Sequence, residues 1–267
     1  MVRKATGQKD TVIVVLRELT TEDGRRRRAR FAAEGEEIVK RAFDYGGRVD
    51  TLILAERFAA DRKSGELIER ARQAGAEVVT ATEGLLSKVL EAKPTPECIA
   101  IVERRLASLD EMLRAPNALV LMVEHGENAD NLGMLLRSTD AVGVDGVVLA
   151  ADTTDPFARR VVRGSRGAVF AVPICIQHDA ARAIDAAKKA GLRVVATSAR
   201  SESPYTSVDF CKPTMIVVGN EHVGITDAVR ERADSVVAIP MRGRINSLNI
   251  AVAASIVMYE AIRQRHA

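Results

Sequence analysis

The sequence predicts an α/β protein with two units, a small α/β sandwich followed by a doubly wound domain with a mostly parallel sheet. Short β-branched runs alternate with helical patterns along the whole chain, which is typical of βαβ units. Two such series are separated by an amphipathic stretch that ends in Ala115-Pro116-Asn117. The length of 267 residues allows one large domain or two smaller ones. We therefore expect domains at 1–105 and 118–267, joined by a linker or short connecting helix at 106–117.

The first series supplies the small α/β sandwich. A helix is predicted from Ala32 to Phe43, because charged and apolar residues recur there at helical spacing. The elements expected after it are a strand at 51–54, a helix at 65–73, a strand at 77–79, a helix at 83–90 and a strand at 98–102.

The second series supplies the doubly wound domain. Its expected strands are at 118–123, 146–149, 193–196, 215–218 and 236–239, with a further extended run at 170–174. Its expected helices are at 131–141, 159–163, 180–190 and 248–265. Five or six strands with helices on both faces form a domain of about 150 residues.

The composition is that of an ordinary globular protein, with 47% hydrophobic and 28% charged residues. No apolar stretch approaches the roughly 18 to 20 residues of a membrane helix, and the N-terminus opens no signal region, so we expect no membrane contact and a cytoplasmic protein. The cysteines Cys98, Cys175 and Cys211 are scattered, odd in number and form no CxxC pair. We expect them to be buried small hydrophobes, and we expect no metal site.

Positive charge is local rather than general. The net charge is +3, and neither half of the chain is basic overall. Aromatic residues make up 3% and Trp is absent, which argues against nucleic-acid recognition by stacked aromatics. Two arginine clusters could contact phosphates. The alternative is a frayed loop for the first cluster and a solvated surface helix for the second. The candidate RNA-binding residues are Arg26, Arg27, Arg28 and Arg30 in the run that starts at Arg25, and Arg159, Arg163 and Arg166 on one predicted helix face.

Three polar, glycine-containing segments follow predicted strands, where a doubly wound domain binds its ligand. They span 124–137, 217–225 and 239–254. Asn128 or Asn131 could simply cap a helix, and Ser247 could cap another. Arg137 follows Leu135-Leu136 on a helix suited to burial, so we expect a buried arginine that needs an anionic partner. Dinucleotide binding is disfavoured because no GxGxxG occurs.

Together these segments resemble a known family. The patterns are Asn-x-x-Asn-x-Gly-x-x-x-Arg at 128–137, Gly-Asn-Glu-x-x-Gly-Ile at 219–225 and Ile-Pro-Met-x-Gly-x-x-x-Ser-Leu-Asn at 239–249. In this order they resemble the three signature motifs of the SpoU/TrmH family, RNA 2'-O-ribose methyltransferases of the SPOUT class. Ala129 stands where the family commonly has Pro. More weakly, 30–35 resembles the entry to an L30e-like RNA-binding domain.

The resemblance implies a deep trefoil knot in the C-terminal domain and S-adenosylmethionine as cofactor. The implied cofactor contacts are Gly219, Ile239 and Leu248, with Met241 flanking them. The resemblance also implies a homodimer in which the Arg137 helix of one chain faces the cofactor of its partner.

The implied catalytic residues are Arg137, Asn131, Glu221, Ser247 and Asn249. The family proposal makes Arg137 the base. The alternative is a phosphate clamp, because arginine is effectively never deprotonated in proteins. Asn131, Ser247 and Asn249 would place the ribose, and Glu221 would orient a loop or pair with an arginine. Structural capping is the alternative for these four residues.

We therefore expect S-adenosylmethionine-dependent 2'-O-methylation of RNA, with 23S-type ribosomal RNA preferred because of the L30e-like domain. The alternatives are a transfer-RNA methyltransferase, an antibiotic-resistance enzyme that modifies ribosomal RNA, and a non-catalytic RNA-binding or ribosome-assembly factor.

Overall fold

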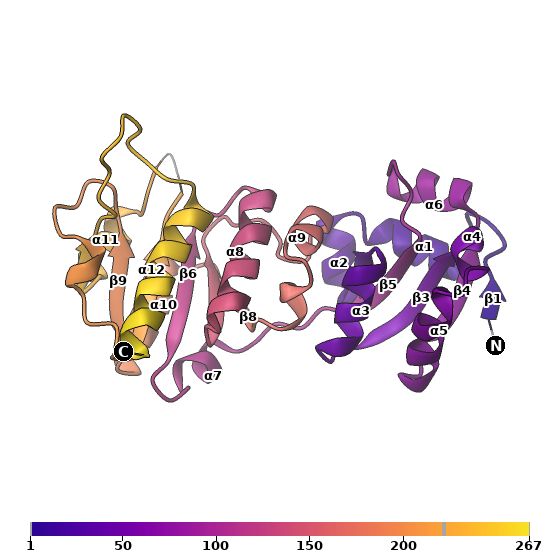
Figure 1. Ribbon diagram of the computed structural model, residues 1–267, viewed down its shortest axis with the longest axis horizontal. Coiled ribbons are helices and arrows are strands. Elements are labelled where there is room, and N and C mark those ends of the chain that lie inside the picture. Colours follow the sequence, from indigo (N-terminus) through magenta and orange to yellow (C-terminus); the bar gives the residue numbers. More distant parts are fainter. Residues whose placement is uncertain (1, 221–222, 267) are drawn as a thin grey trace. The chain divides into compact units, whose positions relative to one another are not determined.

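The computed structural model describes residues 2–220 and 223–266, which form two compact units (Figure 1). Unit 1 contains the chain up to Arg105 together with Asp155–Phe170. Unit 2 contains Leu106–Thr154 and the chain from Ala171 onward. Each unit has its own sheet, so the predicted α/β class is confirmed.

Unit 1 is built on a mixed five-stranded sheet in the order β1-β4-β3-β5-β2. Strands β1, β4 and β3 are parallel, whereas β5 runs antiparallel to β3 and β2. The strands are β1 (Val2–Lys4), β2 (Arg30–Glu34), β3 (Val49–Ala55), β4 (Glu77–Ala81) and β5 (Cys98–Glu103). The first six helices are α1 (Thr11–Glu18), α2 (Glu22–Arg28), α3 (Glu36–Asp44), α4 (Glu56–Ala59), α5 (Ser64–Gln73) and α6 (Glu83–Leu90).

The predicted helix from Ala32 to Phe43 is wrong at its start. Residues up to Glu34 form strand β2, in which Ala32 pairs with Ile101, and the helix begins only at Glu36. Gly35 separates the two elements with φ 93°, a conformation that favours glycine. The tertiary pairing with β5 therefore overrides the helical pattern. Elements β1, α1, α2 and α4 were not predicted.

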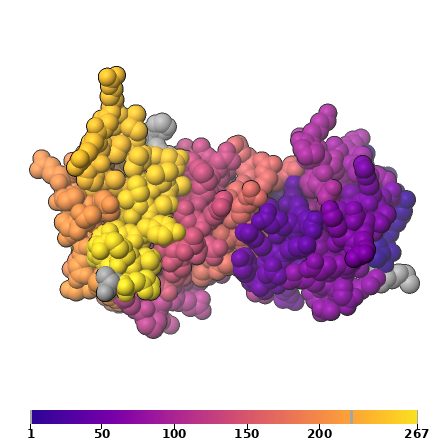
Figure 2. All heavy atoms as spheres, viewed as in Figure 1, coloured from indigo at the N-terminus to yellow at the C-terminus, as the bar shows by residue number. Residues whose placement is uncertain are grey.

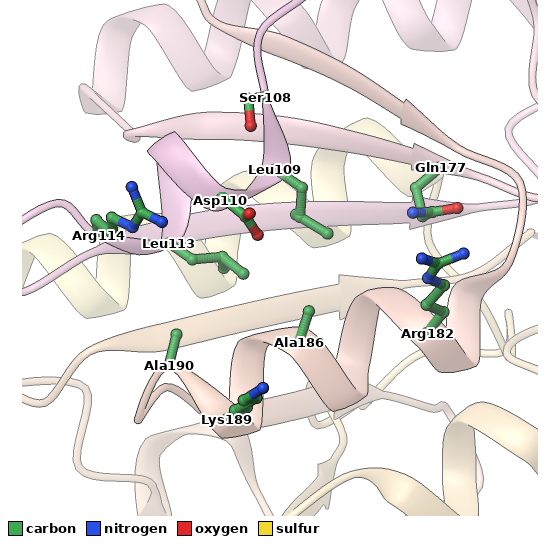
Figure 3. Close-up of a pocket in the computed structure, with 10 residues that line it drawn as sticks. All are labelled: Ser108, Leu109, Asp110, Leu113, Arg114, Gln177, Arg182, Ala186, Lys189 and Ala190. Atoms are coloured by element: carbon green, nitrogen blue, oxygen red, sulfur yellow. The ribbon is translucent and has the colours of Figure 1, made fainter.

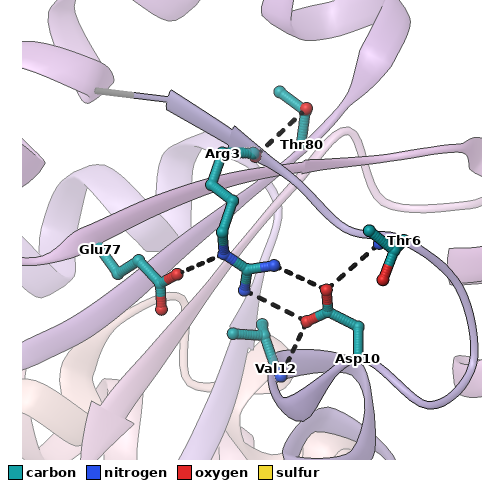
Figure 4. A network of polar contacts seen from close by, with 6 residues as sticks. All are labelled: Arg3, Thr6, Asp10, Val12, Glu77 and Thr80. Carbon is teal, nitrogen blue, oxygen red and sulfur yellow. Dashed lines mark hydrogen bonds and ion pairs between the residues drawn. The ribbon is translucent and has the colours of Figure 1, made fainter.

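An ion-pair network attaches the edge strand β1 to the rest of unit 1 (Figure 4). Arg3 donates to Glu77 at 2.7 Å and to both carboxylate oxygens of Asp10 at 2.6 and 3.1 Å. Asp10 also accepts from the backbone of Val12 and so caps α1. The hydrogen bonds from Arg3 hold the pKa of Asp10 below its usual value. The network joins β1, β4 and the start of α1.

Segment 155–170 packs in unit 1, although in the chain it lies between two strands of unit 2. It contains α9 (Arg159–Gly164) and the short 3-10 helix η1 (Ala168–Phe170). The rings of Phe157 and Phe170 lie 4.9 and 5.7 Å from that of Phe31. Arg25 donates to Asp155 at 2.7 Å, with both side chains at most 6% exposed. The structure thus differs from the expected continuous domain at 118–267, because this segment buries its apolar side chains against β2.

Unit 2 contains a six-stranded sheet in the order β11-β9-β10-β6-β7-β8, in which every pairing is parallel. The strands are β6 (Leu119–Glu124), β7 (Gly146–Ala150), β8 (Ile174–Gln177), β9 (Arg193–Thr197), β10 (Thr214–Val218) and β11 (Ser235–Val237). The helices are α7 (Leu109–Leu113), α8 (Ala129–Val142), α10 (Ala180–Lys189), the 3-10 helix η2 (Tyr205–Ser207), α11 (Asp227–Arg232) and α12 (Ile250–Arg265).

Helices cover both faces of this sheet, as a doubly wound domain requires. Helices α7, α10 and α11 share one core with alternate strand residues such as Val120 and Met122. Helices α8 and α12 pack against each other and against the opposite face. Segment 106–117 contains the short helix α7, in agreement with the connecting-helix alternative, and Met112 and Leu113 of this helix are buried in the first of these cores.

Cys98 and Cys175 are buried as predicted, and burial raises the pKa of the Cys98 thiol to about 12, but Cys211 is exposed.

Within the described residues, no helix is long and apolar enough to cross a membrane. The same part of the chain holds no cluster of three or more His, Cys, Asp or Glu side chains suited to a metal ion. The trefoil knot stays a prediction.

We predict that Asp155→Ala lowers the free energy of unfolding by about 3–5 kcal/mol, because it leaves the Arg25 guanidinium buried without its counter-ion. Arg27→Ala is the matched control. Its ion pair with Asp23 is largely exposed, and its loss costs less than about 1 kcal/mol. Urea unfolding followed by circular dichroism measures both variants. Equal stability of the two variants would contradict a structural role for the buried pair.

Candidate active site

The parallel sheet of unit 2 brings three loops to one edge. Strands β6, β10 and β11 end at Glu124, Val218 and Val237, and the loops that follow them lead into α8, α11 and α12. Because carboxyl ends of parallel strands share one edge, the three predicted motifs meet there.

Two asparagines begin the helices on this edge. The Asn128 side chain caps α8 by accepting from the backbone N–H of Asp130 at 2.9 Å and of Asn131 at 3.3 Å. The Asn249 side chain caps α12 by accepting from Ala251 and Val252 at 3.0 and 3.4 Å. The prediction that Ser247 caps this helix is therefore wrong, because the helix begins two residues later than that cap requires.

One hydrogen bond joins the first and third motifs. The Asn249 Nδ2 donates to the Asn131 Oδ1 at 2.8 Å, across 118 residues of sequence. The same Asn249 amide uses its oxygen for the helix cap, so its orientation is fixed from both ends. The structure thus brings together two residues that the sequence selected separately.

The second motif forms a tight loop beside the first. Asn220 donates its side-chain N–H to the carbonyl of His125 at 3.2 Å, and its own carbonyl accepts from Gly224 at 2.8 Å. A Cβ atom at Gly219 would lie 2.3 Å from the carbonyl carbon of Gly224, so only glycine fits this loop. Glu221, which the sequence predicted to orient the loop, lies outside the described residues.

Glu124 is a positioning residue that the sequence prediction missed. It is buried at the end of β6 and accepts from the backbone and the hydroxyl of Thr226 at 2.9 and 2.8 Å. Thr226 is the N-cap of α11, so Glu124 fixes the start of that helix relative to β6. The available signal was a carboxylate directly after five apolar strand residues, where burial requires a partner.

A cavity of about 330 Å³ lies against the second and third motifs. This volume falls within the range of small-molecule sites in proteins. The predicted cofactor contacts Gly219, Ile239, Met241 and Leu248 all line the cavity, as does Ser247. The other lining residues are Thr197, Ser198, Ala199, Arg200, Val218, Asn220, Val223, Gly224, Arg230, Val237, Asn246, Ile250 and Ala253.

A second cavity, of about 550 Å³, lies between α7 and α10 (Figure 3). Its lining includes Leu113, Arg182 and Lys189 but none of the predicted site residues. Although this cavity is larger, the smaller one holds the motif residues and is the better candidate for the site.

Arg137 does not line either cavity. The prediction of a buried arginine is wrong, because Arg137 lies on the exposed face of α8, one turn after the exposed Met134. Its guanidinium makes no hydrogen bond or ion pair with any residue that the structure describes. Within one chain, the predicted catalytic arginine therefore stands apart from the cavity.

Most of the predicted RNA-binding arginines are engaged within unit 1. Arg27, Arg28 and Arg30 pair with Asp23, Glu18 and Asp50, while Arg159 and Arg166 pair with Glu34 and Glu37. The expected shared helix face for the second cluster is wrong, because α9 ends at Gly164, before Arg166. Arg26 and Arg163 are exposed and make no such contact with another described residue.

Residues 118–259 match the model of the SpoU rRNA Methylase family, which covers more than half of the chain. The chain belongs to the SpoU rRNA methylase family. Residues 11–100 match a second family model, the MRM3-like substrate binding domain. The predicted resemblance to the SpoU/TrmH family is therefore confirmed, as is a substrate-binding domain in the first part of the chain.

Relatives of this methylase match both units. A Streptomyces viridochromogenes protein named 23S rRNA (uridine(2479)-2'-O)-methyltransferase is 29% identical and covers 90% of this chain and 85% of its own. The AdoMet-bound rRNA methyltransferase from Sinorhizobium meliloti has a TM-score of 0.88 at 28% identity, with 98% of each chain covered. The AdoMet complex of AviRb from Streptomyces viridochromogenes has a TM-score of 0.87 at 28% identity, covering 97% of this chain and 99% of that one.

We predict that Asn249→Ala destabilises the methylase by about 1 kcal/mol through loss of the α12 cap, and that Asn249→Ser restores most of this loss. Methyl transfer is expected to fall at least tenfold in both variants, because neither can donate the amide N–H that holds Asn131. Thermal unfolding and turnover are measured side by side. Full activity of Asn249→Ser would show that Asn249 acts only as a helix cap and that its hydrogen bond to Asn131 is not needed for methyl transfer.

Proposed function

We propose that this methylase transfers a methyl group from S-adenosylmethionine to a ribose 2'-hydroxyl in 23S-type ribosomal RNA. The observation that carries the proposal is the Asn249–Asn131 hydrogen bond at the edge of the sheet where the motif-lined cavity lies. Relatives named as rRNA methyltransferases match over both units, which supports ribosomal RNA as the substrate class.

The cavity suits S-adenosylmethionine chemically. Apolar side chains such as Val218, Ile239 and Leu248 offer a surface for an adenine ring, while hydroxyl and amide groups offer partners for its ribose. Arg200 and Arg230 suit a carboxylate, and no acidic residue is present among the described lining residues. When bound, the cofactor supplies an electrophilic methyl group on a positively charged sulfur.

The residues of the chain would align the hydroxyl with that methyl group. Alignment of two reactants is worth up to roughly 7–11 kcal/mol when the geometry is ideal. We assign ribose placement to Asn131, Ser247 and Asn249, and loop orientation to Glu221. Arg137 acts as a clamp on phosphate that polarises the hydroxyl, because its guanidinium keeps its proton. The hydroxyl proton then leaves to water or to a phosphate oxygen.

We also propose a homodimer in which Arg137 completes the partner's site. The first ten residues of α12 contain no charged side chain, which is typical of a helix covered on all sides. Nevertheless Val252 and Tyr259, seven residues apart, are about half exposed, and Met134 is similarly exposed on the neighbouring α8. A second copy packed on these apolar side chains would cover them and receive Arg137 from the same face.

Unit 1 is proposed to recognise the RNA, since its sequence matches a substrate-binding domain. Arg26 and Arg163 are its remaining candidates for phosphate contact. We place the reaction in the cytoplasm and propose no metal.

The substrate assignment is tested by incubating the full chain with methyl-labelled S-adenosylmethionine and purified 23S, 16S and transfer RNA. We expect label in 23S RNA, released as a 2'-O-methyl nucleoside. Label found only in transfer RNA would show that the substrate is transfer RNA and not ribosomal RNA. Failure to label any RNA, together with calorimetry that shows no cofactor binding, would instead indicate the non-catalytic assembly factor.

The shared site is tested with heterodimers of Arg137→Ala and Gly219→Ala, purified through two different affinity tags. In the proposed dimer, each site combines the cavity of one chain with Arg137 of the other chain. The heterodimer therefore has one site with both parts intact, and about half of the wild-type activity should return although each homodimer is inactive. Heterodimers of Asn249→Ala and Gly219→Ala are the control and stay inactive, because each intact Arg137 then faces a damaged site. An inactive Arg137 heterodimer would place the arginine in its own chain's site.

A further inference from the structure

The loop between β11 and α12 has two kinds of side chain. Met241, Ser247 and Leu248, near its two ends, line the cavity. Arg242, Arg244 and Ile245, between them, are exposed. In Figures 1 and 2 this loop projects from the rest of unit 2. The loop thus connects the candidate cofactor cavity directly to a solvent-facing tip.

The tip carries positive charge that no described residue neutralises. Neither Arg242 nor Arg244 forms a hydrogen bond or ion pair with any other residue in the described part of the chain. The sequence has no Asp or Glu between Asp234 and Glu260. Because guanidinium groups stay charged in proteins, these two favour an anionic partner from outside the chain. Most arginines of the predicted clusters in unit 1, in contrast, already have carboxylate partners.

Apolar side chains accompany this charge. Among the described residues, the two most exposed large hydrophobic side chains are Val223 at 77% and Ile245 at 65%. Each belongs to one of the two motif loops that line the cavity. A single exposed apolar residue needs no explanation, but both loops expose one beside the cavity. A partner with apolar as well as anionic groups therefore suits this rim, as nucleotides do.

We propose that Arg242 and Arg244 bind RNA phosphates next to the target nucleotide, with Ile245 in contact with a sugar or base. This inference rests on the proposed function and assigns substrate contacts to positions that vary within the third motif pattern. Phosphate contacts hold a nucleic acid in place without reading its sequence. The loop that lines the cofactor cavity would thus also position the RNA strand that carries the reacting hydroxyl.

The experiment compares Arg242→Ala/Arg244→Ala with wild type in RNA affinity at several salt concentrations, in kcat and KM for 23S RNA, and in S-adenosylmethionine affinity. We expect the KM for RNA to rise at least about tenfold while cofactor affinity stays unchanged. In the double alanine variant, the magnitude of the slope of log affinity against log salt concentration should fall by about 1.4. Each lost contact with a phosphate of single-stranded RNA lowers it by roughly 0.7, and the variant loses two such contacts. Arg242→Lys/Arg244→Lys should restore the slope.

Arg182→Ala/Lys189→Ala is the matched control, since it removes the same charge at the cavity shown in Figure 3. The control should keep the wild-type slope. An unchanged slope and KM in Arg242→Ala/Arg244→Ala would overturn the inference, and so would a slope reduced equally in the control. Loss of cofactor binding or of the dimer in that variant would also overturn it. Failure of the proposed function is distinct, because wild type would then methylate no ribosomal RNA.

Discussion

The parallel direction of six strands is the constraint on which the rest of unit 2 depends. It collects the ends of β6, β10 and β11 at one edge, so that three loops far apart in sequence become neighbours. Side chains then fix the loops. Glu124 holds the start of α11, Asn220 holds the loop before α8, and Asn249 holds Asn131. Each contact joins segments that follow two different strands, which makes the site a property of the sheet edge rather than of any single motif.

Charge in this protein follows tertiary contacts more than sequence clustering. The run of four arginines in α2 looks like a phosphate-binding stripe, yet Arg25 is buried against Asp155, and Arg27 and Arg28 pair with nearby carboxylates. The pair Arg242 and Arg244 looks minor in the sequence, but it lies on an exposed loop and makes no ion pair with any described carboxylate. An arginine that already has a counter-ion offers less to RNA than one that has none.

In the proposed homodimer, a single chain supplies only part of the chemistry. The cavity and the Asn131–Asn249 pair lie at one sheet edge, whereas Arg137 projects from α8 beside exposed apolar residues. The proposed second copy would explain together the exposed apolar side chains of α8 and α12 and an arginine that makes no polar contact with the described residues. Dimerisation would then contribute to catalysis as well as to stability.

The sequence by itself determined most of the alternation of strands and helices and the parallel sheet of unit 2, because these depend on local pattern and spacing. The motif residues around the cavity came from the resemblance of three sequence segments to the SpoU/TrmH family. Only the tertiary structure decided that residues 32–34 form a strand, that 155–170 packs in unit 1 and that Arg137 is exposed. It also decided that Asn249, rather than Ser247, caps α12. These outcomes depend on partners distant in the chain, such as β5 for β2 and Arg25 for Asp155, which local periodicity does not encode.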